Sequence, residues 1–121
     1  MLRSRLVDRS IREARFNELL LEVIDDNLNR LFGGMAGNLV YSFLKTVASL
    51  DREDITSDLV GFDAGLRKLL GSGATVLEKV IVKDLYSRLG LSVPLDDSFT
   101  ELIEKAKNSY SMRRGKIEVL L

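Results

Sequence analysis

The sequence contains no cysteine, no histidine and no tryptophan, and it has a single proline. Without cysteine there is no disulfide, no thiolate metal ligand and no sulfur nucleophile. Without histidine the chain lacks both the commonest general base and the commonest metal ligand. Zinc and non-haem iron sites usually need one or both residue types, so neither is expected. Only a magnesium or calcium site made of carboxylates stays open, and we predict neither a cofactor nor an enzyme.

Long apolar runs are also missing, because none approaches the roughly 20 residues that span a bilayer. The basic residues near the start of the chain are not followed by the apolar stretch of a secretory signal. We therefore expect a cytoplasmic protein that does not associate with membranes.

The net charge of the chain is zero, but the charges are distributed unevenly. Residues 1–15 carry a net charge of +3 and residues 105–121 a net charge of +4, so residues 16–104 carry −7. Basic ends could contact the phosphates of a nucleic acid. They could also cover the acidic middle of the same chain or of a partner. The second interpretation is favoured, because a chain without net charge does not attract polyanions overall.

The length of 121 residues is that of one ordinary domain, and we predict a single helical domain over residues 1–121. Within it, residues 1–15 form a basic helical extension and residues 111–121 a possible tail. No segment alternates apolar and polar residues in the manner of a strand. Apolar residues instead recur at spacings of three and four in five segments, which we predict as helices: residues 2–31, 35–50, 59–70, 72–90 and 98–110.

The fold class that follows is all-α, a compact bundle of about five helices. The first segment is longer than most globular helices, so it is either one continuous helix or two helices with a bend near residues 16–17. The fourth carries apolar residues around most of its circumference, which is typical of a central helix. We expect the second and third helices to pack on the fourth.

Several helix ends are marked by their sequence. Asp58 precedes the third helix as an N-cap, and Ser98 with Glu101 matches a capping box at the start of the fifth. Glycines follow the first, third and fourth helices, where a left-handed residue is favoured. On the third helix, Gly61 and Gly65 lie one turn apart and would let another helix approach closely.

Two glycine-containing segments resemble three known binding motifs and are better explained as structure. The turn at residues 71–73 opens a helix, as a phosphate site does, but it follows a helix and lacks the lysine of a P-loop. With its flanking helices it has the outline of a helix-turn-helix, yet the second helix is mostly apolar. Residues 34–37 match the glycine loop of a KH domain only as a string, because flanking strands are absent.

Paired carboxylates, which could do acid–base chemistry or bind a cation, occur at residues 25–26 beside Glu22 and at residues 96–97. We interpret both pairs as solvated faces or as acids that meet a helix dipole. The charged residues of the fourth helix are likewise expected to face outward: Glu78, Lys79, Lys83, Asp84 and Arg88.

One stretch, residues 39–90, combines regular apolar spacing with the glycine turn. The pattern consists of Val40, Tyr41, Leu44, residues 52–55, Phe62, Leu66, residues 69–74, Leu77, Glu78, Ile81, Lys83, Leu85, Tyr86, Leu89 and Gly90. It resembles a small archaeal family, the Nitrosopumilus output domain type of protein. The resemblance implies a short helical domain with a regulatory or interaction role. It brings no catalytic residues, and this chain differs in its long arginine-bearing first helix and its fifth helix.

We predict a non-enzymatic interaction or regulatory domain that forms a homodimer, because a long helix and an apolar tail often complete their burial on a partner. The predicted dimer contacts are Ile11, Ile117, Val119 and Leu120. The alternative is a nucleic-acid-binding protein with basic termini. Its candidate contacts are Arg5, Arg9, Arg12, Arg113 and Arg114. A third function, as an enzyme or a binder of apolar ligands, would need a cavity with a few convergent polar groups.

Overall fold

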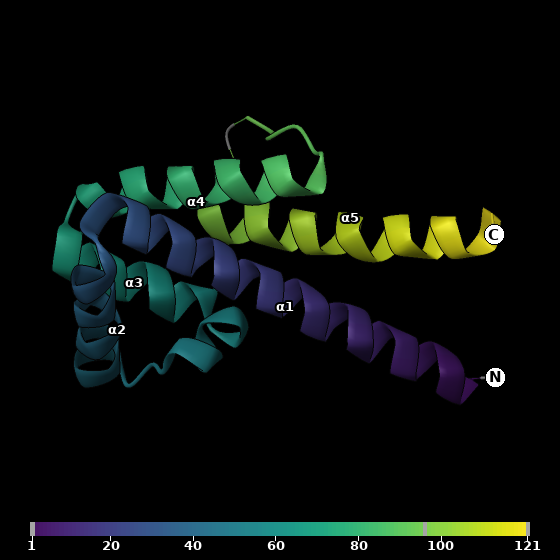
Figure 1. The fold of residues 1–121 in the computed structure, drawn as a ribbon, viewed down its shortest axis with the longest axis horizontal. Coiled ribbons are helices and arrows are strands. Elements are labelled where there is room, and N and C mark those ends of the chain that lie inside the picture. Colours follow the sequence, from purple (N-terminus) through teal and green to yellow (C-terminus); the bar gives the residue numbers. More distant parts are fainter. Residues whose placement is uncertain (1, 96, 121) are drawn as a thin grey trace.

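The computed structural model describes residues 2–95 and 97–120, and within them the side chains of residues 9–95 and 97–111. The described chain is helical and contains no strand, which confirms the all-α prediction (Figure 1). In chain order the elements are α1 (Leu2–Phe32), α2 (Gly34–Ala48), the 3₁₀ helix η1 (Arg52–Ser57), α3 (Leu59–Leu70), α4 (Gly73–Leu89) and α5 (Phe99–Leu120).

The first helix is one continuous element of 31 residues, so the two-helix alternative is wrong. Its core-facing side chains follow the predicted spacing of three and four, and each is almost fully buried: Phe16, Leu20, Val23, Ile24 and Leu28. The helix ends where Gly33 adopts a φ of 82°, a conformation that glycine accepts without strain. The amide of Gly33 donates to the carbonyl of Asn29 at 2.8 Å and closes the last turn.

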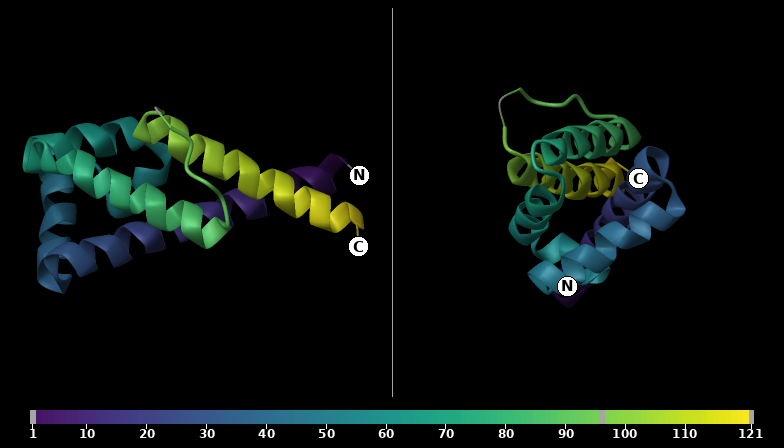
Figure 2. Two further views of the ribbon diagram at one scale, coloured as in Figure 1. Left: turned by 90° about the horizontal axis from the view of Figure 1, so that it is seen from above. Right: turned by 90° about the vertical axis from the view of Figure 1, so that its left-hand side faces the viewer.

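The helices pack around α1, which contacts α2, η1, α4 and α5. The apolar helix α4 is covered on three sides, by α1, α3 and α5. The second helix turns steeply away from α1 and crosses one end of the molecule (Figures 1 and 2). It packs mainly against α1 and α3, so the prediction that it packs on the fourth helix is wrong.

The last helix begins at its predicted cap, where the hydroxyl of Ser98 accepts from the amide of Glu101 at 3.3 Å. It continues through residues 111–120, the region considered a possible tail from the sequence. Against α4, the hydroxyl of Tyr86 donates to the carbonyl of Leu102 at 2.6 Å. Against α1, the rings of Phe16 and Tyr110 lie 5.9 Å apart. The beginning of α1 and the end of α5 project from the same end of the molecule (Figure 1).

The connector between α2 and α3 is more than a polar loop. It forms η1, whose Ile55 is fully buried and which contacts both α1 and α3. The next residue after η1, Asp58, acts as the predicted N-cap of α3, because its carboxylate accepts from the amide of Gly61 at 2.9 Å. Ser72 occupies the N-cap position of α4 without a side-chain capping bond.

The close approach of α2 and α3 depends on Gly65. A Cβ atom built on this residue would overlap Leu44 Cδ2 of α2 and would lie 3.8 Å from the Cβ of Ala48. Leu44 is fully buried and has little room to move away. Gly61 has a different role, because its missing Cβ leaves room for the capping carboxylate of Asp58.

Within the described residues, none of the helices combines the length and the apolar character that crossing a bilayer requires.

We expect Gly65→Ala to lower the free energy of unfolding by about 1 kcal/mol or more, because the cost of overpacking against Leu44 exceeds the gain in helix propensity. Gly73→Ala is the matched control, since its Cβ would lie 3.5 Å from Leu70 in ordinary contact. Denaturant titration measures both variants. A Gly65→Ala protein more stable than the wild type would contradict the close packing. In the double variant with Leu44→Ala, the total loss should be smaller than the sum of the two single losses, as contacting sites are not additive.

Candidate functional site

The residues predicted as contacts at the ends of the chain are only partly within the described side chains. Ile11 is 45% exposed and Arg9 is exposed, so both are available on the surface of α1. Arg12 is half-buried and donates from Nη1 to the carbonyl of Ser111 at 3.3 Å, which ties α1 to α5. The other predicted contacts lie outside the described side chains: Arg5, Arg113, Arg114, Ile117, Val119 and Leu120.

Among the described side chains, several exposed apolar residues lie on α2. Met35 is 86% exposed and Leu39 is 68% exposed, and Val47 is exposed as well. Phe43, half-buried, lies between Leu39 and Val47 at the same spacing of four residues. Because residues four apart share one side of a helix, these four side chains form a single stripe, here called the α2 face.

The α2 face contains no charge, and two further apolar residues are exposed at the end of α1. Leu31 and Phe32, the last two residues of α1, are both exposed. Lys45 is the sole charged residue in the sequence of α2, and it pairs with Asp51 at 3.7 Å. A charge-depleted apolar patch is the composition of an interface core. The face lies at the end of the molecule opposite the two chain termini (Figure 1).

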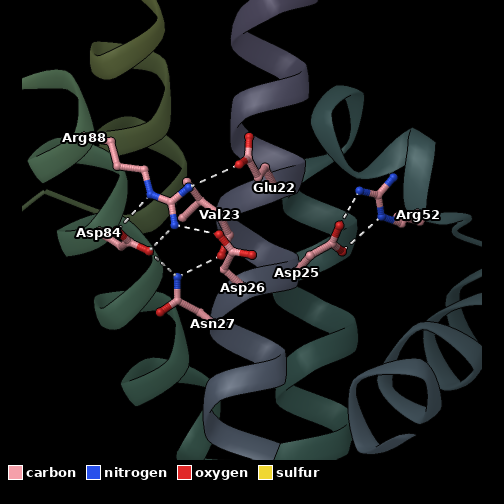
Figure 3. Close-up of polar contacts among 8 residues, drawn as sticks. All are labelled: Glu22, Val23, Asp25, Asp26, Asn27, Arg52, Asp84 and Arg88. Atoms are coloured by element: carbon pink, nitrogen blue, oxygen red, sulfur yellow. Dashed lines mark hydrogen bonds and ion pairs between the residues drawn. The ribbon is translucent and has the colours of Figure 1, made fainter. Parts of the chain in front are cut away.

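The carboxylates at residues 25–26 are structural groups rather than a solvated face. Asp25 accepts from Nε of Arg52 at 3.0 Å (Figure 3). It also accepts from the hydroxyl of Tyr41, so it joins α1 to η1 and α2. Burial alone would raise the pKa of Asp25, but the hydrogen bonds from Arg52 and Tyr41 bring it below the ordinary value. Burial and the Asp25 charge together raise the pKa of Tyr41.

Arg88 of α4 contacts two acids of α1 and one acid of its own helix. Its Nη2 donates to Asp26 at 2.7 Å and its Nε to Asp84 at 3.0 Å, while Nη1 lies 3.8 Å from Glu22 (Figure 3). The hydrogen bonds that it donates to Asp84 and Asp26 raise the pKa of the guanidinium. Burial alone would raise the pKa of Asp84, but the bonds from Arg88 and Asn27 lower it. The paired acids thus hold α1 against α4.

Asn27, which the sequence analysis did not single out, is fully buried between these helices. Its Nδ2 donates to the carbonyl of Val23 and to Asp84 Oδ2, both at 2.8 Å. The signal in the sequence was a polar residue within the apolar stripe of α1. A buried amide costs free energy unless it is hydrogen-bonded, so Asn27 and Asp84 specify how the two helices align.

Glu78 faces inward, so its predicted exposure is wrong. The residue is only 4% exposed, and its Oε1 lies 3.4 Å from Arg67 Nη2. Among the described residues no donor reaches its Oε2. Burial, reinforced by the neighbouring carboxyl group of Asp63, raises the pKa of Glu78 to about 8. Position 78 follows Leu77 and precedes Ile81 on the buried side of α4, where an acid is uncommon.

The described part of the chain contains no group of three or more acidic side chains placed to hold a metal ion. Of the carboxylate pair at residues 96–97, Asp97 pairs with Lys105, and Asp96 lies outside the described residues.

Comparisons with protein families, with curated proteins and with solved structures found no match in any of the three. The resemblance to the Nitrosopumilus output domain type family stays a prediction.

Asp84→Ala should lower the free energy of unfolding at neutral pH by roughly 1–3 kcal/mol, because Asn27 and Arg88 both lose an acceptor. Asp26→Ala is the matched control. It should lower the free energy of unfolding by less, since the carboxylate of Asp26 is more exposed and pairs with Arg88 near the surface. The folded pKa of Asp84 is lowered, so its contribution is complete above the unfolded pKa and is lost as the pH falls through the folded one. Urea titrations at neutral and acid pH measure both effects. Equal losses for the two variants would contradict the role of Asn27.

Glu78→Gln should flatten the pH dependence of stability. The folded pKa of about 8 is above the ordinary value of 4.5, so the protonated acid contributes stability that is complete below the unfolded pKa. That contribution is lost as the pH rises through the folded pKa. Relative to the variant, the wild type should lose roughly 1–3 kcal/mol between about pH 5 and pH 9. Denaturation curves across this range would refute the assignment if the two proteins changed in parallel.

Proposed function

We propose that this chain is a non-enzymatic interaction domain that forms a homodimer through the α2 face. The observation that carries the proposal is the exposure of Met35 and Leu39 in one uncharged stripe with Phe43 and Val47. Burial of such side chains against a partner removes apolar surface from water, which is the main driving force of association. A regulatory role agrees with the family that residues 39–90 resemble.

A second copy of the chain is the partner that suits this face best. In a two-fold dimer the same patch serves both subunits and must be complementary to itself. The stripe is free of charge, so two copies of α2 packed antiparallel place no like charges opposite each other. At about 1.5 Å per residue, the 15 residues of α2 span about 22 Å, enough for a helix–helix contact of several turns.

The expected dimer is weak. A stable interface buries about 800 Å² on each partner. One face of a helix, even together with Leu31 and Phe32, provides a smaller area than this. We therefore expect a dissociation constant of about micromolar or weaker. The proposal places the main contact on α2, away from the beginning of α1, the helix that carries Ile11, at the other end of the molecule (Figure 1).

Light scattering or sedimentation over a concentration series tests the proposal. The wild type should shift from monomer to dimer as its concentration rises, and Leu39→Glu should remain a monomer, because the dimer would bury an unpaired charge. Val76→Glu is the matched control, since Val76 is 62% exposed on α4 and lies outside the α2 face. It should dimerise like the wild type. A wild type that stays monomeric throughout, or a dimer that survives Leu39→Glu, would refute the proposal.

A further inference from the structure

A cleft of about 770 Å³ opens between α3, α4 and the start of α5. The segment that leads into α5 forms one wall, with Val93 and Leu95. Val82, Phe99 and Leu102 supply apolar surface from the helices. The volume is that of a site for a small organic molecule, which typically has apolar walls and a few polar groups.

The polar groups of the cleft converge on Arg67. Its Nε donates to Asp63 at 3.0 Å, its Nη1 to the hydroxyl of Thr75 at 3.3 Å, and its Nη2 to Glu78 at 3.4 Å. All four side chains line the cleft. Two carboxylates therefore share one guanidinium, and when both are ionised one negative charge stays uncompensated.

Glu78 is the deepest of these groups and is incompletely bonded. It is more than nine-tenths buried, and its Oε2 receives no donor from the described residues. This oxygen is closed to solvent, so a ligand in the cleft reaches the pair through Asp63, whose carboxyl group is hydrogen-bonded to that of Glu78. At neutral pH the raised pKa of Glu78 allows it to hold a proton instead, and a bound cation would take the place of that proton.

We propose that this cleft binds a small primary amine with an apolar body, whose ammonium group donates to the carboxylate of Asp63 and is balanced by the Asp63–Glu78 carboxylate pair. The apolar body lies along Val82, Phe99 and Leu102. An ammonium carries one positive charge and three donors, so it both hydrogen-bonds a carboxylate and neutralises the cluster. Lys79 and Lys83 also line the cleft, but both are exposed, so solvent screens their repulsion of the cation. The site involves neither α2 nor self-association.

The test uses n-hexylamine as the probe and follows backbone amide shifts of the full chain by NMR. Hexylamine should shift amides that line the cleft, while hexanol, of the same length but uncharged, should bind about tenfold more weakly or worse, because hydrogen bonds between charged groups are the stronger ones. Hexanoate should bind more weakly still. Hexanol binding as tightly as hexylamine would refute the role of the charge. Hexanoate binding more tightly would assign the cleft to anions and overturn the proposal.

Two variants locate the ammonium. Glu78→Gln should weaken hexylamine about tenfold and leave hexanol unchanged, because the amide keeps the shape of the cleft and loses the charge. Asp63→Asn should also weaken hexylamine and provides a second test if Glu78→Gln fails to fold. Glu53→Gln is the matched control, an exposed acid of η1 that does not line the cleft. Unchanged hexylamine affinity in both cleft variants would refute the proposal.

The pH gives an independent readout. Because hexylamine displaces the proton of Glu78, its affinity should rise by up to tenfold per unit between about pH 6 and pH 8, and that of hexanol should not. The other charged groups that line the cleft are Asp63, Arg67, Lys79, Lys83 and Asp97. A flat profile for hexylamine in the wild type would contradict proton displacement at Glu78.

Discussion

The structure depends on one apolar stripe, which runs along α1 from Phe16 to Leu28. No single element covers it, and α2, η1, α4 and α5 each pack on a part. The residues beside the stripe fix where each neighbour lies. Successive positions of a helix point about 100° apart, so Asp25 reaches Arg52 of η1 while Asp26 reaches Arg88 of α4. One turn of α1 thereby holds two neighbours on different sides.

Helical periodicity and capping residues are local signals, and they predicted the helices well. The N-caps Asp58 and Ser98 form the expected bonds, and the left-handed glycine at position 33 ends the first helix. Gly65 was correctly identified as a point of close approach, although not with its partner Leu44. The caps and the terminal glycine depend on residues within a turn of one another, so a sequence can predict them without knowledge of the fold.

The predictions that failed concern contacts between residues that lie far apart in the sequence. Ile55 has polar neighbours in the sequence, and it is buried because η1 packs against α1 and α3. Glu78 was assigned outward with its charged neighbours, but α3 approaches it and brings Arg67 within reach. The acids at residues 25–26 seemed solvated, and their partners lie 27 and 62 positions away in the chain. Neither the α2 face nor the cleft could be recognised before the neighbours of each helix were known.

The three tyrosines, in a chain without tryptophan, make the domain its own spectroscopic probe. Each lies at a different junction: Tyr41 reaches α1 through Asp25, Tyr86 bonds the backbone of α5, and Tyr110 packs on Phe16 of α1. With no indole to dominate the signal, phenol absorbance and emission report these three junctions alone. In a variant that keeps only one of the three tyrosines, the absorbance and emission of that tyrosine would change when the two helices it joins separate. No attached label is needed.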